Sequence, residues 1–244
     1  MERGLYIAAS GMLAEQVRQD QIANDLANAS TPGYKADTSV QSSFGQVLLS
    51  NTATGQVVGP MSLGVHISQE VTDLTQGPLQ QTGNPLDFAL DGAGFFSVQT
   101  PGGTAYTRDG QFEVDGGGRL ITDTGQPVLG TDGKPIVVGN AKNLSVSAEG
   151  VVKSDGKTVG QLAIVSLTGA QKQGDTLWSG TPGAKPAGTT VDQGYLEGSG
   201  VQPAQAMVDM IVSLRAYESS QRVLQGIDET LSKAVTSVGS ATGS

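Results

Sequence analysis

The two ends of the chain carry the same kind of helical pattern, and a long stretch of different character separates them. In residues 3–29, small and apolar residues recur every three or four positions, which predicts an amphipathic helix. In residues 203–238 the apolar repeat approaches seven residues over four heptads, which is typical of a coiled coil. An isolated amphipathic helix is marginal in water. Each helix must therefore pack against the other, against copies of itself, or against both.

The apolar stripes of these two helices predict the positions of the packing interface. Periodicity alone fits an intramolecular helical hairpin as well as pairing between chains. The small residues of the first helix would let a partner helix approach closely. The predicted interface residues are Leu5, Ala9, Met12, Ile22, Leu26, Met207, Ile211, Leu214, Leu224, Ile227 and Leu231.

The first helix has a sharp predicted end in the sequence L-A-N-A-S-T-P-G-Y (26–34). Proline disfavours helical backbone at the residue before it, and a glycine follows at once. The predicted break consists of Asn28, Thr31, Pro32, Gly33 and Tyr34.

The middle of the chain reads as β-structure. Residues 86–168 hold short alternating or apolar runs between glycine-rich turns, with Asp-Gly pairs beginning at positions 91, 109, 115, 132 and 155. Asp-Gly is a strong hairpin signal, and many short strands indicate a β-sandwich or barrel-like domain. Residues 65–71 are a candidate strand, residues 51–64 read as a loop, and residues 169–194 read as a long loop around the single tryptophan, Trp178.

The expected fold class is α+β, mainly β, with a compact β-rich middle domain between two terminal helices that pair in a coiled-coil-like domain. The expected domains are residues 1–35 with 203–244 as the terminal-helix domain, residues 36–80 as a linker or extended segment, and residues 81–202 as a β-rich outer domain.

Composition argues against several classes of function. The net charge is −9 and no run of Lys or Arg is present, which argues against binding to a nucleic-acid backbone. The chain has no cysteine, which excludes disulfides, thiolate metal sites and cysteine nucleophiles. No stretch approaches the ~20 apolar residues of a membrane span, and the N-terminus lacks the apolar core of a cleavable signal peptide.

No catalytic, cofactor-binding or metal site is predicted. His66 is the single histidine, and no G-x-S-x-G motif accompanies it. The Asp-Gly pairs are irregularly spaced, unlike the ligands of calcium loops, so turn chemistry explains them better. Two alternatives stay open on residue patterns alone. One is a β-rich extracellular binding module, such as an adhesin or carbohydrate-binding domain, and the other is a wall-cutting hydrolase that uses two carboxylates.

Three motifs, in order along nearly the whole chain, resemble those of flagellar rod and hook proteins. They are I-A-N-D-L-A-N-A-S-T-P-G-Y-K (22–35), L-D-F-A-L-D-G-A-G-F-F-S-V-Q (86–99) with A-Y-T-R-D-G-Q-F-E-V-D-G-G-G-R-L (105–120), and G-Y-L-E-G-S-G-V-Q-P-A-Q-A-M-V-D-M-I-V-S-L-R-A-Y-E (194–218). Asp25 stands where the family usually has Asn, and Ser199-Gly200-Val201 stands where it usually has Ser-Asn-Val.

The resemblance implies a structural, non-enzymatic subunit of the bacterial flagellar basal-body rod. Such subunits are similar in plan: their terminal helices form a coiled-coil inner tube, and their β-domains lie outside it. It implies export without a cleavable signal, unfolded, through the flagellar type III apparatus, and helical polymerisation with copies of itself and other rod and hook axial proteins. The short 36–70 segment and the E-G-S-x-V-Q-P junction favour the proximal rod type over a distal-rod or hook-like subunit. In this reading the break turns the chain outward into a linker, and Tyr34 and Lys35 anchor the chain to its neighbours.

Overall fold

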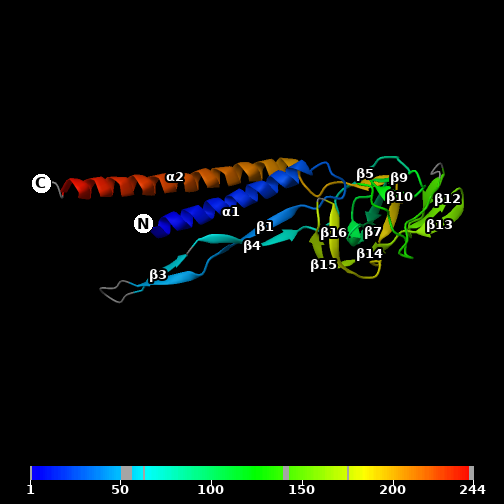
Figure 1. The fold of residues 1–244 in the computed structure, drawn as a ribbon, viewed down its shortest axis with the longest axis horizontal. Coiled ribbons are helices and arrows are strands. Elements are labelled where there is room, and N and C mark those ends of the chain that lie inside the picture. The colour runs from blue at the N-terminus through cyan, green and yellow to red at the C-terminus, as the bar shows by residue number, and fades with distance from the viewer. Residues whose placement is uncertain (1, 51–56, 63, 140–142, 175, 242–244) are drawn as a thin grey trace. The chain divides into compact units, whose positions relative to one another are not determined.

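The chain folds into two compact units. The computed structural model describes all residues except 1, 51–56, 63, 140–142, 175 and 242–244 (Figure 1). The helical unit consists of Met1–Ala27, Asp37–Thr72 and Pro203–Ser244, and the β unit consists of Asn28–Ala36 and Asp73–Gln202. The chain therefore passes between the two units four times, and neither unit is continuous in sequence.

Two long helices form the main part of the helical unit. They are α1, Glu2–Ala27, and α2, Pro203–Ala241. The two helices pack side by side in opposite directions (Figure 1). At Gly4 an added Cβ would lie 3.4 Å from Ile227 Cδ1, and at Gly11 one would lie 3.8 Å from Ser220 Oγ. The predicted helices at both ends of the chain are confirmed, and the small residues of α1 lie where α2 comes close.

A β-hairpin arm completes the helical unit. Its strands are β1 (Asp37–Ser43), β2 (Gln46–Ser50), β3 (Val57–Ser62) and β4 (Val65–Thr72). β1 pairs with β4 and β2 with β3, both antiparallel. The strand predicted over 65–71 is confirmed. The loop predicted over 51–64 is wrong for residues 57–62, while 51–56 and 63 lie outside the described residues. The Gly-Pro pair within β3 suggests a loop in the sequence, but a two-stranded ribbon has edges that tolerate proline.

The β unit is built from many short antiparallel strands, as the turn-rich sequence predicts. Its strands are β5 (Leu79–Gln81), β6 (Phe88–Asp91), β7 (Phe95–Thr100), β8 (Gly103–Thr107), β9 (Phe112–Val114), β10 (Leu120–Thr122), β11 (Leu144–Val146), β12 (Val151–Ser154), β13 (Lys157–Gln161), β14 (Ile164–Val165), β15 (Leu167–Lys172), β16 (Leu177–Pro182), β17 (Thr190–Gln193) and β18 (Tyr195–Glu197). The largest sheet has the order β14-β7-β8-β16-β15, and β11-β12-β13 form a three-stranded sheet.

The core of the β unit is apolar and continuous across these small sheets. Phe88, Phe96 and Phe112 lie at its centre, with Phe96 and Phe112 in edge-to-face contact at 5.3 Å between ring centroids. The neighbouring Phe95 points to the other face of β7, into a second cluster with Tyr106 and Trp178. This alternation is expected of a strand that is buried on both faces.

The long loop predicted over residues 169–194 is wrong. The segment contains most of β15 and all of β16 and β17. β15 is the edge strand of the five-stranded sheet, and its side chains are half-buried or exposed. A polar, glycine-interrupted edge strand lacks the apolar alternation by which strands are detected.

The Asp-Gly pair at 155–156 forms the tight turn that its chemistry predicts. It joins β12 to β13, with Ser154 opposite Lys157, and both turn residues have positive φ, 50° for Asp155 and 77° for Gly156. These angles belong to the type I′ turn. Among the described residues no group of three or more His, Asp or Glu side chains could hold a metal ion.

Candidate assembly surfaces and a buried charge cluster

The seam between α1 and α2 follows a heptad on α2. Among its buried and half-buried positions, one continuous row consists of Ala206, Met210, Ser213, Tyr217, Ser220, Leu224, Ile227 and Leu231, and Asp209 and Ala216 flank it. The residues of this row are spaced alternately by four and three residues, which is the spacing of a coiled-coil seam. The sequence pattern predicts these seam positions, but it does not distinguish them from a second apolar face of the same helix.

The structure separates the predicted interface residues into two sets. Ala9, Met12, Ile22, Leu26, Leu224, Ile227 and Leu231 are half-buried within the helical unit. Leu5, Met207, Ile211 and Leu214 stay exposed, each with 41–51% of its surface accessible. The first set holds the unit together internally, and the second remains available to other molecules.

A buried polar contact fixes the register of the helix pair. The hydroxyl of Ser213, which is fully buried, lies 2.7 Å from Glu15 Oε2. The other carboxylate oxygen of Glu15 accepts a bond from Gln41 Nε2 at 3.4 Å, which joins β1 to the same point. A polar pair inside an apolar seam stabilises the one register in which its hydrogen bond forms, because in any other register the polar groups are buried without a partner. Serine in a seam position is the sequence signal that could have identified this contact.

The α1 helix ends before the predicted break. Ala27 is its last residue, and Thr31 N–H then donates to Asn28 O at 3.1 Å in a tight turn. Gly33 has a φ of 67°, and its N–H donates to Glu197 O at 2.8 Å. A Cβ on Gly33 would lie 2.4 Å from the carbonyl carbon of Arg108. Only glycine fits here, because of both the backbone angle and the close approach.

Beyond the break, the chain is held by a buried cluster of charges in the β unit. Lys35 Nζ and Arg108 Nη1 each contact the carboxylate of Glu197, the arginine at 3.1 Å. Lys35 is 1% exposed, Arg108 3% and Glu197 0%. Glu197 also accepts the backbone N–H of Gly77 at 2.8 Å, and Lys35 Nζ donates to Thr75 O.

This junction cluster (Lys35, Arg108 and Glu197) joins three segments of the β unit that lead to or from the helical unit. Residues 28–36, residues 73–77 and residues 197–202 all meet there. Two cations share one carboxylate, so Glu197 gives a partner to both charges that would otherwise be buried unpaired. Sequence reasoning does not single out this cluster, because isolated charged residues carry no periodic signal.

Tyr34 and Lys35, which are expected to anchor the chain beyond the break, both lie inside the β unit. Tyr34 is fully buried, and Lys172 Nζ lies 3.9 Å from the centroid of its ring. Gly200 N–H donates to Tyr34 O at 2.9 Å. Both side chains are used inside the β unit, where a Lys–Glu pair and a cation–π contact satisfy them.

One buried carboxyl of the β unit has an altered protonation equilibrium. Burial, with a smaller contribution from the nearby carboxylates of Asp123 and Asp87, raises the pKa of Asp109 to about 6, although a hydrogen bond from Gln111 N–H at 2.9 Å opposes the change. Hydrolysis of a polysaccharide would need two carboxyl groups roughly 5–9.5 Å apart that flank a substrate in an open cleft. Asp109 is instead 5% exposed, so a polysaccharide cannot reach it.

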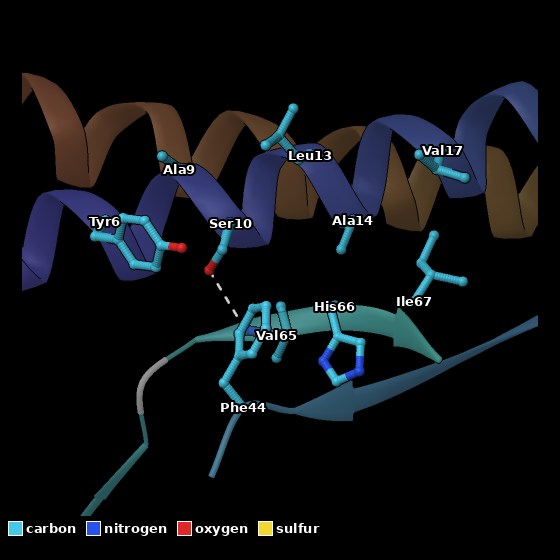
Figure 2. Close-up of a pocket in the computed structure, with 10 residues that line it drawn as sticks. All are labelled: Tyr6, Ala9, Ser10, Leu13, Ala14, Val17, Phe44, Val65, His66 and Ile67. Atoms are coloured by element: carbon cyan, nitrogen blue, oxygen red, sulfur yellow. Dashed lines mark hydrogen bonds between the residues drawn. The ribbon is translucent and has the colours of Figure 1, made fainter. Parts of the chain in front are cut away.

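An open apolar groove lies on the helical unit between α1 and the β1–β4 arm (Figure 2). Its volume is about 310 Å³. Tyr6, Leu13 and Val17 border it on α1, and Phe44 and His66 border it on the arm. The lone histidine thus packs beside an aromatic ring, 4.6 Å from the centroid of Phe44, and forms part of a surface rather than a catalytic set.

Comparison with known families places three matches along the chain. Residues 5–35 match a profile described as flagella basal body rod protein. Residues 89–154 match the flagellar hook protein FlgE/F/G D1 domain, and residues 192–237 match the flagellar basal body rod FlgEFG protein C-terminal region. The order of the three matches is the order of the three motifs described above.

Several curated proteins resemble the chain over its whole length. The flagellar basal-body rod protein FlgF of Caulobacter vibrioides is 33% identical over 247 residues, which cover 98% of this chain and 99% of that protein. The flagellar hook-basal body complex protein FlhO of Bacillus subtilis is 32% identical, covering 98% and 99%. The flagellar basal-body rod protein FlgG of the same organism is 33% identical, covering 96% and 98%.

Proposed function

The chain belongs to the flagellar basal-body rod protein family, and on that premise we propose that it polymerises helically into the rod as one of its structural subunits. Proteins of this family are structural rather than catalytic, and we propose that this chain likewise has no enzymatic activity. Its place is then the basal body, outside the cytoplasmic membrane. No described helix is long and apolar enough to cross a membrane.

One observation carries the polymerisation proposal. α2 satisfies its seam with α1 and still exposes a second apolar face, Met207, Val208, Ile211, Val212 and Leu214, each about half accessible. Apolar side chains that gather on one helix face mark an interaction surface. A subunit that stacks on copies of itself and on other rod and hook axial proteins needs such a surface in addition to its internal packing.

We propose export in an unfolded state through the flagellar type III apparatus. A chain free of cysteine can be threaded without reducing any disulfide, which is consistent with this route. The short hairpin arm and the E-G-S-x-V-Q-P junction at 197–203 support a proximal position along the rod. Both segments can be replaced by the corresponding segments of a distal-type relative to test this proposal.

Electron microscopy of cells that lack this chain tests the proposal. Hooks and filaments should be missing while the membrane-embedded base remains. Complementation with Leu214→Asp should not restore them, although the β unit should fold normally, because Leu214 is exposed and lies outside the internal seam. The matched control is Gln225→Asp, which places the same charge on an exposed polar position of α2. Normal flagella without the chain would refute a rod function.

A further inference from the structure

The groove on the helical unit is built to receive an apolar ligand. Tyr6 and Leu13 are 63% and 64% exposed, and Val17 and Phe44 are also open to solvent. At the groove floor the hydroxyl of Ser10 donates to Ile7 O at 2.8 Å and accepts from Val65 N–H at 3.3 Å. The polar side chain of the floor is therefore already satisfied by the unit itself. An occupant gains from apolar contact and needs no hydrogen-bonding group.

The second open apolar surface of the helical unit is the α2 stripe, defined as Met207, Val208, Ile211, Val212 and Leu214. It occupies the first three turns of α2, where these side chains are 47–53% exposed. Further along the helix Glu218, Arg222 and Gln225 are exposed, and Val223 and Val235 are single exposed apolar side chains, 52% and 72% accessible. The stripe is thus the part of α2 where exposed apolar side chains cluster, and the seam with α1 uses the other side of the helix.

The groove and the stripe are both apolar, and the groove is long enough to hold the stripe. The groove follows α1 from Tyr6 to Val17, which at ~1.5 Å per residue is about 16 Å, and the stripe from Met207 to Leu214 is about 10 Å long. No described residue that lines the groove is Asp, Glu, Lys or Arg, so an aliphatic stripe meets no buried charge there. We propose that the groove of one copy receives the α2 stripe of a second copy.

This contact deepens the proposed polymerisation and rests on it. A contact between two unlike surfaces of the same chain is heterologous, and repeated heterologous contacts generate open helical arrays. A stripe that met another stripe would instead close into a dimer. Because groove and stripe lie on one chain, each copy can offer both halves of the contact.

A few hundred Å² of apolar surface on each side is less than the roughly 800 Å² per partner of a standard interface. The contact is therefore weak between two free subunits and becomes effective through repetition in the polymer.

Disulfide cross-linking in assembled basal bodies tests this contact, and the absence of native cysteine makes the result unambiguous. Two single-cysteine variants, Leu13→Cys in the groove and Ile211→Cys in the stripe, are produced together in cells that lack the native chain. Basal bodies are isolated and oxidised, and linked peptides are identified by mass spectrometry. A linkage between positions 13 and 211 must join two copies, because neither chain carries both cysteines. The control pairs Leu13→Cys with Gln225→Cys, an exposed α2 position beyond the stripe.

We expect the 13–211 linkage to exceed the 13–225 linkage at least fivefold. Basal bodies that contain the chain but show equal linkage for both pairs overturn the groove contact and leave the rod function standing. A predominant linkage of position 13 to a different basal-body protein also overturns it, since the groove then has another occupant. If the native chain is absent from basal bodies, the rod function itself fails, and the contact fails with it.

Discussion

Replacing Glu197 by glutamine removes the anion of the junction cluster while preserving side-chain shape. In the native chain its carboxylate pairs with Lys35 and Arg108 and accepts the N–H of Gly77, all out of contact with water. An amide oxygen in the place of Oε1 can still accept from Lys35 and from Gly77 N–H, but the amide nitrogen must then face Arg108. Two buried cations are left without a counter-charge.

The magnitude follows from what buried ion pairs cost when one partner is removed. Truncating one member typically lowers the free energy of unfolding by ~3–5 kcal/mol, because the remaining charge stays buried and unpaired. For a β unit of about 140 residues, each 1 kcal/mol corresponds to roughly 3–4 °C in melting temperature. Glu197→Gln should therefore lower the melting temperature of the β unit by about 10–20 °C.

Trp178 provides a specific assay for this unit. It is the single tryptophan of the chain, it is 1% exposed, and it packs in the β unit against Phe95 and Tyr106. Its fluorescence during thermal and denaturant unfolding of the full-length chain therefore reports the β unit and not the helices. The matched control is Glu113→Gln, the same chemical change at an exposed position of β9, where surface electrostatics predicts a change below ~1 kcal/mol.

Equal stability losses for Glu197→Gln and Glu113→Gln would refute the reasoning. A second test uses the coupling between the charges. Lys35→Met in the Glu197→Gln background removes one of the two unpaired cations, so it should recover about 1 kcal/mol or more, although Lys35→Met alone destabilises. Additive losses in the double variant would mean that the two residues do not share one electrostatic site.

Three further changes have definite expected outcomes. Asp109→Asn should raise the free energy of unfolding at pH 7.5 by on the order of 1–3 kcal/mol and leave it unchanged at pH 4. The reason is that the Asp109 carboxyl keeps its proton up to about pH 6 in the folded chain but releases it near pH 3.8 in the unfolded chain. Denaturant titrations of both proteins at the two pH values check this, and an equal gain at both would contradict the buried carboxyl. Gly33→Ala should cost at least about 3 kcal/mol by Trp178 fluorescence, since its Cβ meets the Arg108 backbone, whereas Gly83→Ala, with a similar φ of 73° but open space, should cost only ~1–2 kcal/mol. Gly11→Ala should stabilise the helix pair by ~0.5–1 kcal/mol in circular-dichroism melts, because the new methyl lies at ordinary contact distance from Ser220. Gly226→Ala, where the new methyl meets open space, is the comparison. A loss of stability for Gly11→Ala alone would mean that the seam is tighter than this distance indicates.

The terminal helices and many of the short strands can be predicted from the sequence because their signals are local. Helical periodicity identifies α1 and α2, Pro32 and Gly33 bound the first helix, and the Asp-Gly pair at 155 marks a hairpin. Residues 57–62 and 169–194 escape prediction for one physical reason. Most of these strands lie in two-stranded ribbons or, like β15, at a sheet edge, while β16 lies between β8 and β15; all are stabilised by pairing with a neighbour and carry little apolar alternation of their own.

The sequence predicts which residues of α2 are apolar, but not which of its two apolar faces each residue belongs to. A single apolar stripe on α2 includes Met207, Ile211 and Leu214, which the fold leaves open, and Leu224 and Ile227, which it places in the seam. Separating the two faces requires knowing on which side α1 lies. The junction cluster cannot be predicted at all, because its three charged residues meet only through the tertiary fold of the β unit.

The contacts that define both units join opposite ends of the chain, and this has a consequence for the order of folding. Lys35 and Glu197 are separated by 162 residues, and Glu15 and Ser213 by 198. High contact order slows folding, because a long loop must close before any stabilising contact forms. The junction cluster cannot form until residues 35 and 197 are both free to fold, and the helix seam cannot form until residues 15 and 213 are. A chain with this connectivity therefore stays extensible until nearly its whole length is present at one place.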